Sequence, residues 1–177
     1  MNKKMHSTIA ECVSQELLVA EFYSLFARLF DEDREFWLRI MHEELEHGRL
    51  LQTRLQDLIV KGVLSEHDIP ADLGAILIQG SSITDLFLDL QETAPSRTGA
   101  FVIALALENS ISERHFHALA GEHFPKAVQD LFGSLAQDEK DHIKLIEQYA
   151  AECGISLCEK MVLDSSESTF KEILHQS

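Results

Sequence analysis

Apolar residues recur at intervals of three and four along four long stretches, which is the spacing of one buried face on an α-helix. Local signals mark the ends of these stretches: Thr8 to Glu11 match a capping box, Gly62 and Gly154 are helix stops, and Pro125 suits a first helical position. The predicted helices span residues 8–30, 33–61, about 95–121 and 125–153.

The segment between the second and third helices, residues 63–94, contains Pro70, Gly74 and Gly80, so we expect no single helix across it. Ser82 and the acid that follows it predict a short helix ending near Glu92. Two tight turns and one long crossover predict an all-α fold, a four-helix bundle over residues 1–155. Residues 156–177 form a predicted C-terminal tail with a short helix.

Polar residues interrupt the apolar stripe of every long helix, at positions that face the predicted bundle interior. The second and fourth helices each contribute Glu-x-x-His, and the first and third each contribute one glutamate. The six residues are Glu16, Glu44, His47, Glu108, Glu139 and His142. Within the 41–50 stretch, we expect Glu43 and Glu46 to lie on the helix flanks and His42 nearer the outside.

The Glu-x-x-His spacing can also arise by chance or belong to a protease motif. With 19 Glu and 9 His in 177 residues, chance produces the spacing about once, and it occurs three times. We assign the copy at Glu172 and His175 to chance, because no partner glutamate accompanies it. A zinc-protease HExxH motif is excluded, because Glu46 stands where the second histidine would be needed.

Burying four carboxylates and two imidazoles in an apolar core is very costly without compensating charge. Two divalent metal ions would supply that charge, and this ligand set is the one found in di-iron and di-manganese carboxylate bundles. Asp138 could accept a hydrogen bond from the outer nitrogen of His47 or simply lie on a solvated flank. Cys12 lies one turn from Glu16 and is either redox-active or a small buried apolar residue.

The chain has a formal charge of -15, which argues against nucleic acid and anionic membranes as partners. We found no signal peptide or membrane-spanning run, and we expect a cytoplasmic protein. The three cysteines, Cys12, Cys153 and Cys158, form no paired CxxC motifs. A rubredoxin module is therefore not expected, and an electron donor would have to be a separate molecule.

With these residues, the sequence over about 8–153 resembles the ferritin-like superfamily, and within it the rubrerythrin-like proteins. The resemblance implies that Glu44 and Glu139 bridge two iron ions, or manganese or another divalent metal. It also implies that Glu16 and Glu108 are terminal ligands, that His47 and His142 complete one metal each, and that Tyr23 is a catalytic residue near the site. In one departure, Ile111 stands where rubrerythrins usually have a further glutamate.

The resemblance implies an oxidoreductase that reacts with hydrogen peroxide or dioxygen. The alternatives are a ferroxidase or iron-storage protein, and a non-catalytic bundle that a metal stabilises and that acts through its surface. A second apolar row on the first helix predicts a homodimer, unless the crossover or the tail covers that row. The row consists of Leu18, Phe22, Leu25, Phe26 and Leu29.

Overall fold

The computed structural model describes residues 3–65, 74–111 and 124–157, and this part of the chain is all-helical. A 3-10 turn, η1 (Asp31–Asp33), separates the first two long helices. The helices are α1 (Lys3–Leu29), α2 (Arg34–Val60), α3 (Gly74–Glu92), α4 (Arg97–Ile111) and α6 (Lys126–Glu152). The prediction of an all-α fold is therefore confirmed.

The boundaries of α2 and α6 agree closely with the sequence prediction, and Pro125 caps α6. The start of α1 was predicted wrongly: the helix begins at Lys3, so Thr8 lies inside it and does not cap it. The expected third helix is described only as far as Ile111. Its predicted end at Gly121, and most of the C-terminal tail, lie outside the described residues.

Helix α3 is longer than the short helix predicted from Ser82, because it already begins at Gly74 and passes through Gly80. A glycine inside a helix costs only about 1 kcal/mol relative to alanine, so Gly80 does not force an interruption. Pro70, in contrast, lies outside the helix and outside the described residues. The connection between α2 and α4 therefore contains a helix of 19 residues.

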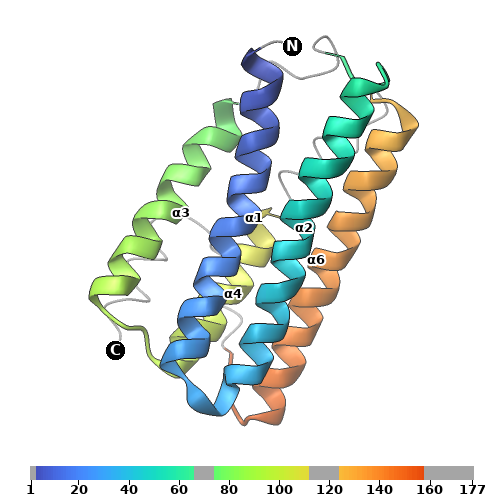
Figure 1. Cartoon of the computed structure of the whole chain (residues 1–177). Helices are drawn as coiled ribbons and strands as arrows, with labels where there is room; N and C mark the ends of the chain where they lie inside the picture. Colours follow the sequence, from blue (N-terminus) through green and yellow to red (C-terminus); the bar gives the residue numbers. More distant parts are fainter. Residues whose placement is uncertain (1–2, 66–73, 112–123, 158–177) are drawn as a thin grey trace.

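Four helices contact one another in a ring, in which α1 packs on α2, α2 on α6, α6 on α4, and α4 on α1. Helices α1, α2 and α6 run side by side along one axis, with α4 behind them (Figure 1). Helix α4 is the most enclosed of the four, since residues 100–108 are all buried. A residue on α4 can therefore carry a polar group only if that group has a partner inside the protein.

Helix α3 lies outside this ring and packs on α1 (Figure 1). It covers much of the apolar row that suggested a homodimer: the rings of Phe22 and Phe87 are 5.0 Å apart, and Phe22 and Phe26 are fully buried. Helix α3, within the crossover, thus covers most of this apolar row within one chain. Leu29 of the row remains exposed, at 38%, and the homodimer stays a prediction. No helix in the described ranges is long and apolar enough to cross a membrane.

Candidate metal centre

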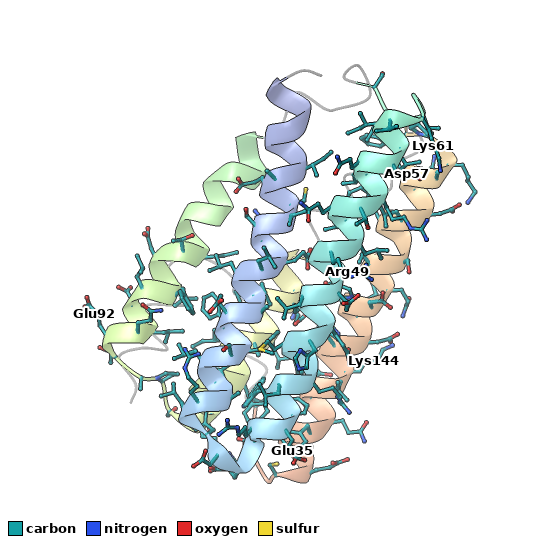
Figure 2. The ribbon with its side chains drawn as sticks, in the orientation of Figure 1. Glu35, Arg49, Asp57, Lys61, Glu92 and Lys144 are labelled. Carbon is teal, nitrogen blue, oxygen red and sulfur yellow. The ribbon has the colours of Figure 1, made fainter. Side chains whose placement is uncertain are left out.

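The structure brings the six predicted residues together in the middle of the helix ring. Glu16 comes from α1, Glu108 from α4, and one Glu-x-x-His each from α2 and α6. All six are buried, with exposures between 0% and 8%. Charged residues on the outer faces of these helices, such as Glu35, Arg49 and Lys144, project outward (Figure 2). The helical period thus separates an inner polar set from an outer one.

The six side chains form two overlapping groups, and within each group one donor atom per residue lies within 4.8 Å of the others. The first group consists of Glu16, Glu44, His47 and Glu139. The second consists of Glu44, Glu108, Glu139 and His142. Glu44 and Glu139 belong to both groups, so their carboxylates lie between the two histidines. Each group offers three carboxylates and one imidazole.

Both histidines direct Nδ1 toward the carboxylates. Nδ1 of His142 is 2.8 Å from Oε1 of Glu44 and 3.5 Å from Oε2 of Glu108. Nδ1 of His47 is 3.4 Å from Oε2 of Glu44 and 3.6 Å from Oε1 of Glu139. The two imidazole rings are 5.5 Å apart. Nδ1 of each ring therefore faces the same small volume between the carboxylates.

The outer nitrogen of each histidine faces a carboxylate on the opposite helix. Nε2 of His47 lies 3.7 Å from Oδ2 of Asp138, the residue that the sequence indicated as a possible partner. Nε2 of His142 hydrogen-bonds to Oε2 of Glu43 at 2.8 Å. The two relationships are equivalent, because Asp138 precedes Glu139 and Glu43 precedes Glu44. An outer carboxylate fixes the tautomer and orientation of a ligating histidine.

The sequence analysis placed Glu43 on a helix flank and missed its contact with a histidine. Its side chain is in fact half-exposed, at 46%, so the flank position was right while the contact was not foreseen. The available signal was the shared pattern of an acid immediately before each Glu-x-x-His. Only the position of α6 beside α2 shows which histidine that acid meets.

Tyr23 is fully buried and donates its hydroxyl proton to Oε1 of Glu108. Its ring stacks on that of Trp37, with ring centroids 5.8 Å apart. Burial, together with the negative charge of Glu108, raises the pKa of Tyr23 well above its ordinary value. The phenol therefore remains protonated at neutral pH and holds one oxygen of Glu108.

Helices α1 and α2 pack closely at Gly48, beside the cluster. A Cβ atom added to Gly48 would lie 3.5 Å from Cβ of Glu16 and from Cδ2 of Leu17, which is ordinary van der Waals contact. A small side chain at this position is therefore compatible with the packing of α1 on α2 next to Glu16.

Each of the six side chains has one buried polar atom without a hydrogen-bond partner in the described part of the chain, apart from contacts within the cluster. The atoms are Oε2 of Glu16, Oε1 of Glu44, Nδ1 of His47, Oε2 of Glu108, Oε1 of Glu139 and Nδ1 of His142. A buried polar atom that lacks a partner costs about 1–3 kcal/mol, and more when it is charged. Six such atoms face one buried volume, and positive ions bound there would provide the partners that these atoms lack.

The ionisation of the metal-free cluster reflects the crowding of charge. Burial, followed by repulsion from Glu44, raises the pKa of Glu16 well above its ordinary value. Burial, followed by repulsion from Glu108, does the same for Glu139. Without metal, these carboxyl groups retain protons because several carboxylates cannot all be ionised in one apolar volume.

The pKa values of Glu44 and His142 move in the directions expected for an ion pair. Burial raises the pKa of Glu44, but its contacts with His142 and His47 outweigh burial and lower it to about 2. Burial lowers the pKa of His142, while its contacts with Glu108 and Glu44 outweigh burial and raise it to about 11. A metal ion at Nδ1 would have to displace that proton.

Cys12 contributes no reactive thiol to this site. Its side chain is buried, and burial together with Glu16 and Glu11 raises its pKa to about 12. It packs in the core as a small apolar residue. The sequence-predicted chance motif at Glu172 and His175 lies outside the described residues.

The fold and the cluster define a helical protein with buried acidic and histidine groups that could hold metal ions. Comparisons with protein-family models, curated proteins and solved structures found no match to this chain. The functional argument therefore rests on the geometry of the cluster itself.

Proposed function

We propose that this protein binds two transition-metal ions and uses them in redox chemistry. The observation that supports the proposal best is the sharing of Glu44 and Glu139 between two complete donor groups. A single ion held by one group would leave one carboxylate and one imidazole of the other group buried without a charge partner. Two ions give a counter-charge to every buried polar atom of the cluster that lacks a partner.

In this proposal, Glu44 and Glu139 would each contribute to holding both ions. Glu16 and His47 complete one coordination sphere, and Glu108 and His142 complete the other. The four ring helices then constitute a ferritin-like bundle of the rubrerythrin type, in which α3 belongs to the crossover. Four protein donors per ion would leave coordination positions open for an oxidant, if the ions are iron or manganese.

We further propose that the resident metal is iron and that the oxidant is hydrogen peroxide or dioxygen. The iron ions would supply two electrons per reaction by changing between their ferrous and ferric states. The chain contributes two things. Its buried apolar side chains limit the access of water, and its carboxylates balance the changing charge of the ions. Tyr23 holds one oxygen of Glu108 through its hydroxyl group, which leaves the other oxygen for an ion.

Metal analysis tests the first part of the proposal. Protein prepared without chelators should contain about two transition-metal ions per chain, and Glu44→Ala or His142→Ala should lose most of that metal. Glu46→Ala is the matched control, because Glu46 lies on α2 but is exposed and pairs with Arg49. Full metal retention in both cluster variants would overturn the assignment.

Stopped-flow mixing tests the second part. Anaerobic Fe(II)-loaded protein should be oxidised by hydrogen peroxide at least as fast as by dioxygen, and iron content should remain near two per chain. Fast oxidation by dioxygen alone, with continued uptake of many further irons, would favour a ferroxidase or storage role. Metal binding with no oxidation by either reagent would favour a stabilising metal.

A further inference from the structure

A continuous column of aromatic rings leads from the candidate metal centre to the protein surface. Tyr23, at the cluster, stacks on Trp37 at 5.8 Å, and Trp37 meets Phe36 edge-on at 4.8 Å. Phe36 then stacks on Tyr149 at 3.9 Å, with the two ring planes only 5° apart. Phe101 gives a second ring contact between Trp37 and Tyr149.

The outer end of this column opens into a groove of about 740 Å³ between the beginning of α2 and the end of α6. Phe36 and Tyr149 both line this groove, together with Arg34, Arg39 and Gln148. Tyr149 is half-buried, whereas Trp37 and Tyr23 are fully buried. The column therefore connects solvent with a volume that solvent does not reach.

Both tyrosines have a carboxylate positioned to accept a proton. The Tyr149 hydroxyl donates to Oδ1 of Asp33 at 3.1 Å, and the Tyr23 hydroxyl donates to Glu108. A phenol gives up its proton when it loses an electron, so a hydrogen-bonded carboxylate lowers the barrier to its oxidation. Nε1 of Trp37 has no hydrogen-bond partner among the described residues. An oxidised indole there keeps its proton and can take an electron from a neighbour.

The composition of the chain sharpens this observation. Tryptophan and tyrosine are the aromatic side chains that lose one electron most readily, and the whole sequence has one Trp and two Tyr. All three lie in this one column. The other aromatic rings in the described part of the core are phenylalanines, which are not readily oxidised.

We propose that the column carries one-electron oxidising equivalents from the metal centre to Tyr149, where a small reductant in the groove removes them. This inference rests on the proposed redox function of the cluster. In each transfer, Tyr149 gives one electron to oxidised Trp37 and its hydroxyl proton to Asp33. The Tyr149 phenoxyl radical then takes an electron from a one-electron donor, such as an enediol or a thiol, and recovers its proton from Asp33, while the oxidised donor releases its own proton to solvent. Two such transfers, with two protons from solvent, balance the reduction of one hydrogen peroxide to two waters.

Flash photolysis of the metal-free protein tests the column directly. Because Trp37 is the only tryptophan, a laser pulse at a wavelength that only tryptophan absorbs will ionise this one residue. We expect the absorption of the tryptophan radical to be replaced by that of a tyrosyl radical, at a rate that is independent of protein concentration. Decay of the tryptophan radical without any tyrosyl radical would overturn the proposal.

Two conservative variants identify the receiving tyrosine. Tyr149→Phe should lose the part of the tyrosyl signal that a water-soluble reductant quenches rapidly, and Tyr23→Phe should retain that part. The double variant should lose the tyrosyl signal entirely and lengthen the life of the tryptophan radical. An unchanged, rapidly quenched signal in Tyr149→Phe would refute the role of Tyr149. Circular dichroism checks that each variant remains helical. Since no metal is present, this experiment is independent of whether the cluster binds metal, which metal analysis decides.

Discussion

Nε2 of His142 on α6 lies 2.8 Å from Oε2 of Glu43 on α2, whereas Nε2 of His47 on α2 lies 3.7 Å from Oδ2 of Asp138 on α6. The first distance is that of a hydrogen bond, and the second is too long for one. The two halves of the cluster thus have the same plan, but one histidine is held more firmly than its counterpart.

This difference predicts unequal effects of removing the two outer carboxylates. Glu43→Gln should weaken metal binding about 10–100-fold, because the outer partner of a ligating histidine orients the ring and raises its basicity. Asp138→Asn should have a smaller effect. Competition titrations with a chromogenic chelator measure both affinities, and Glu46→Gln on the exposed face of α2 is the control. Equal losses in the Glu43 and Asp138 variants would contradict the asymmetry.

The raised pKa values of Glu16 and Glu139 predict how the metal-free protein responds to pH. A carboxyl group whose pKa is higher in the folded state stabilises the fold below its unfolded pKa of about 4.5, and that contribution is lost as pH rises through the folded pKa. Chelator-treated protein should therefore show a falling Tm as pH increases above about 4.5, and bound metal should remove this decline.

Glu139→Gln separates this electrostatic effect from simple loss of packing. The neutral amide cannot ionise, so the variant should have a higher Tm than the parent protein when both are metal-free at pH 8. With metal added, only the parent protein should be stabilised. Thermal unfolding followed by circular dichroism measures both, and a lower Tm for the variant under all conditions would count against the crowded-carboxylate explanation.

The environment of Cys12 predicts a low reactivity toward alkylating reagents. Thiolate is the reactive form, and burial raises the pKa of Cys12 to about 12. Cys153 is less buried, at the end of α6, and should react first. Iodoacetamide labelling followed by peptide mass spectrometry would show the order of modification. Rapid labelling of Cys12 in the folded protein would restore it as a redox candidate.

The ion pair between Arg97 and Asp33 leads to a prediction about stability. Its guanidinium donates two hydrogen bonds to the fully buried carboxylate of Asp33, at 2.7 and 2.6 Å. Among the described residues, Arg97→Ala leaves that buried carboxylate with the Tyr149 hydroxyl as its remaining side-chain hydrogen-bond donor, which should cost about 2–4 kcal/mol. Denaturant unfolding measures the loss. Arg34→Ala, which breaks an exposed 3.9 Å contact with Asp31, should cost at most about 1 kcal/mol.

The all-helical class and the proximity of the six buried polar residues could both be predicted from the sequence. The reason is geometric: a helix has one period, so a glutamate that interrupts an apolar stripe must share the interior with that stripe. Glu16, Glu44 and Glu139 follow this rule, and the structure places each of them at exposures of 1%. Whether these residues bind metal remains a prediction.

Contacts between helices were harder to foresee, because they depend on how two faces meet. Glu43 is on a flank by its period, yet α6 brings His142 against it. The apolar row of α1 suggested a second chain, but α3 covers much of it from within the same chain. The length of α3 was also underestimated, since Gly80 was given more weight as a helix breaker than its small energetic cost justifies.

Asp33 has a consequence for how the chain assembles. Its carboxylate joins residues that are 64 and 116 positions away in the sequence, Arg97 and Tyr149. Because these contacts close large loops between the α1–α2 turn, α4 and α6, we expect them to form late in folding. Substitutions there should speed unfolding much more than they slow refolding. Through its hydrogen bond to Tyr149, Asp33 would then also slow the loss of the stacking between Tyr149 and Phe36.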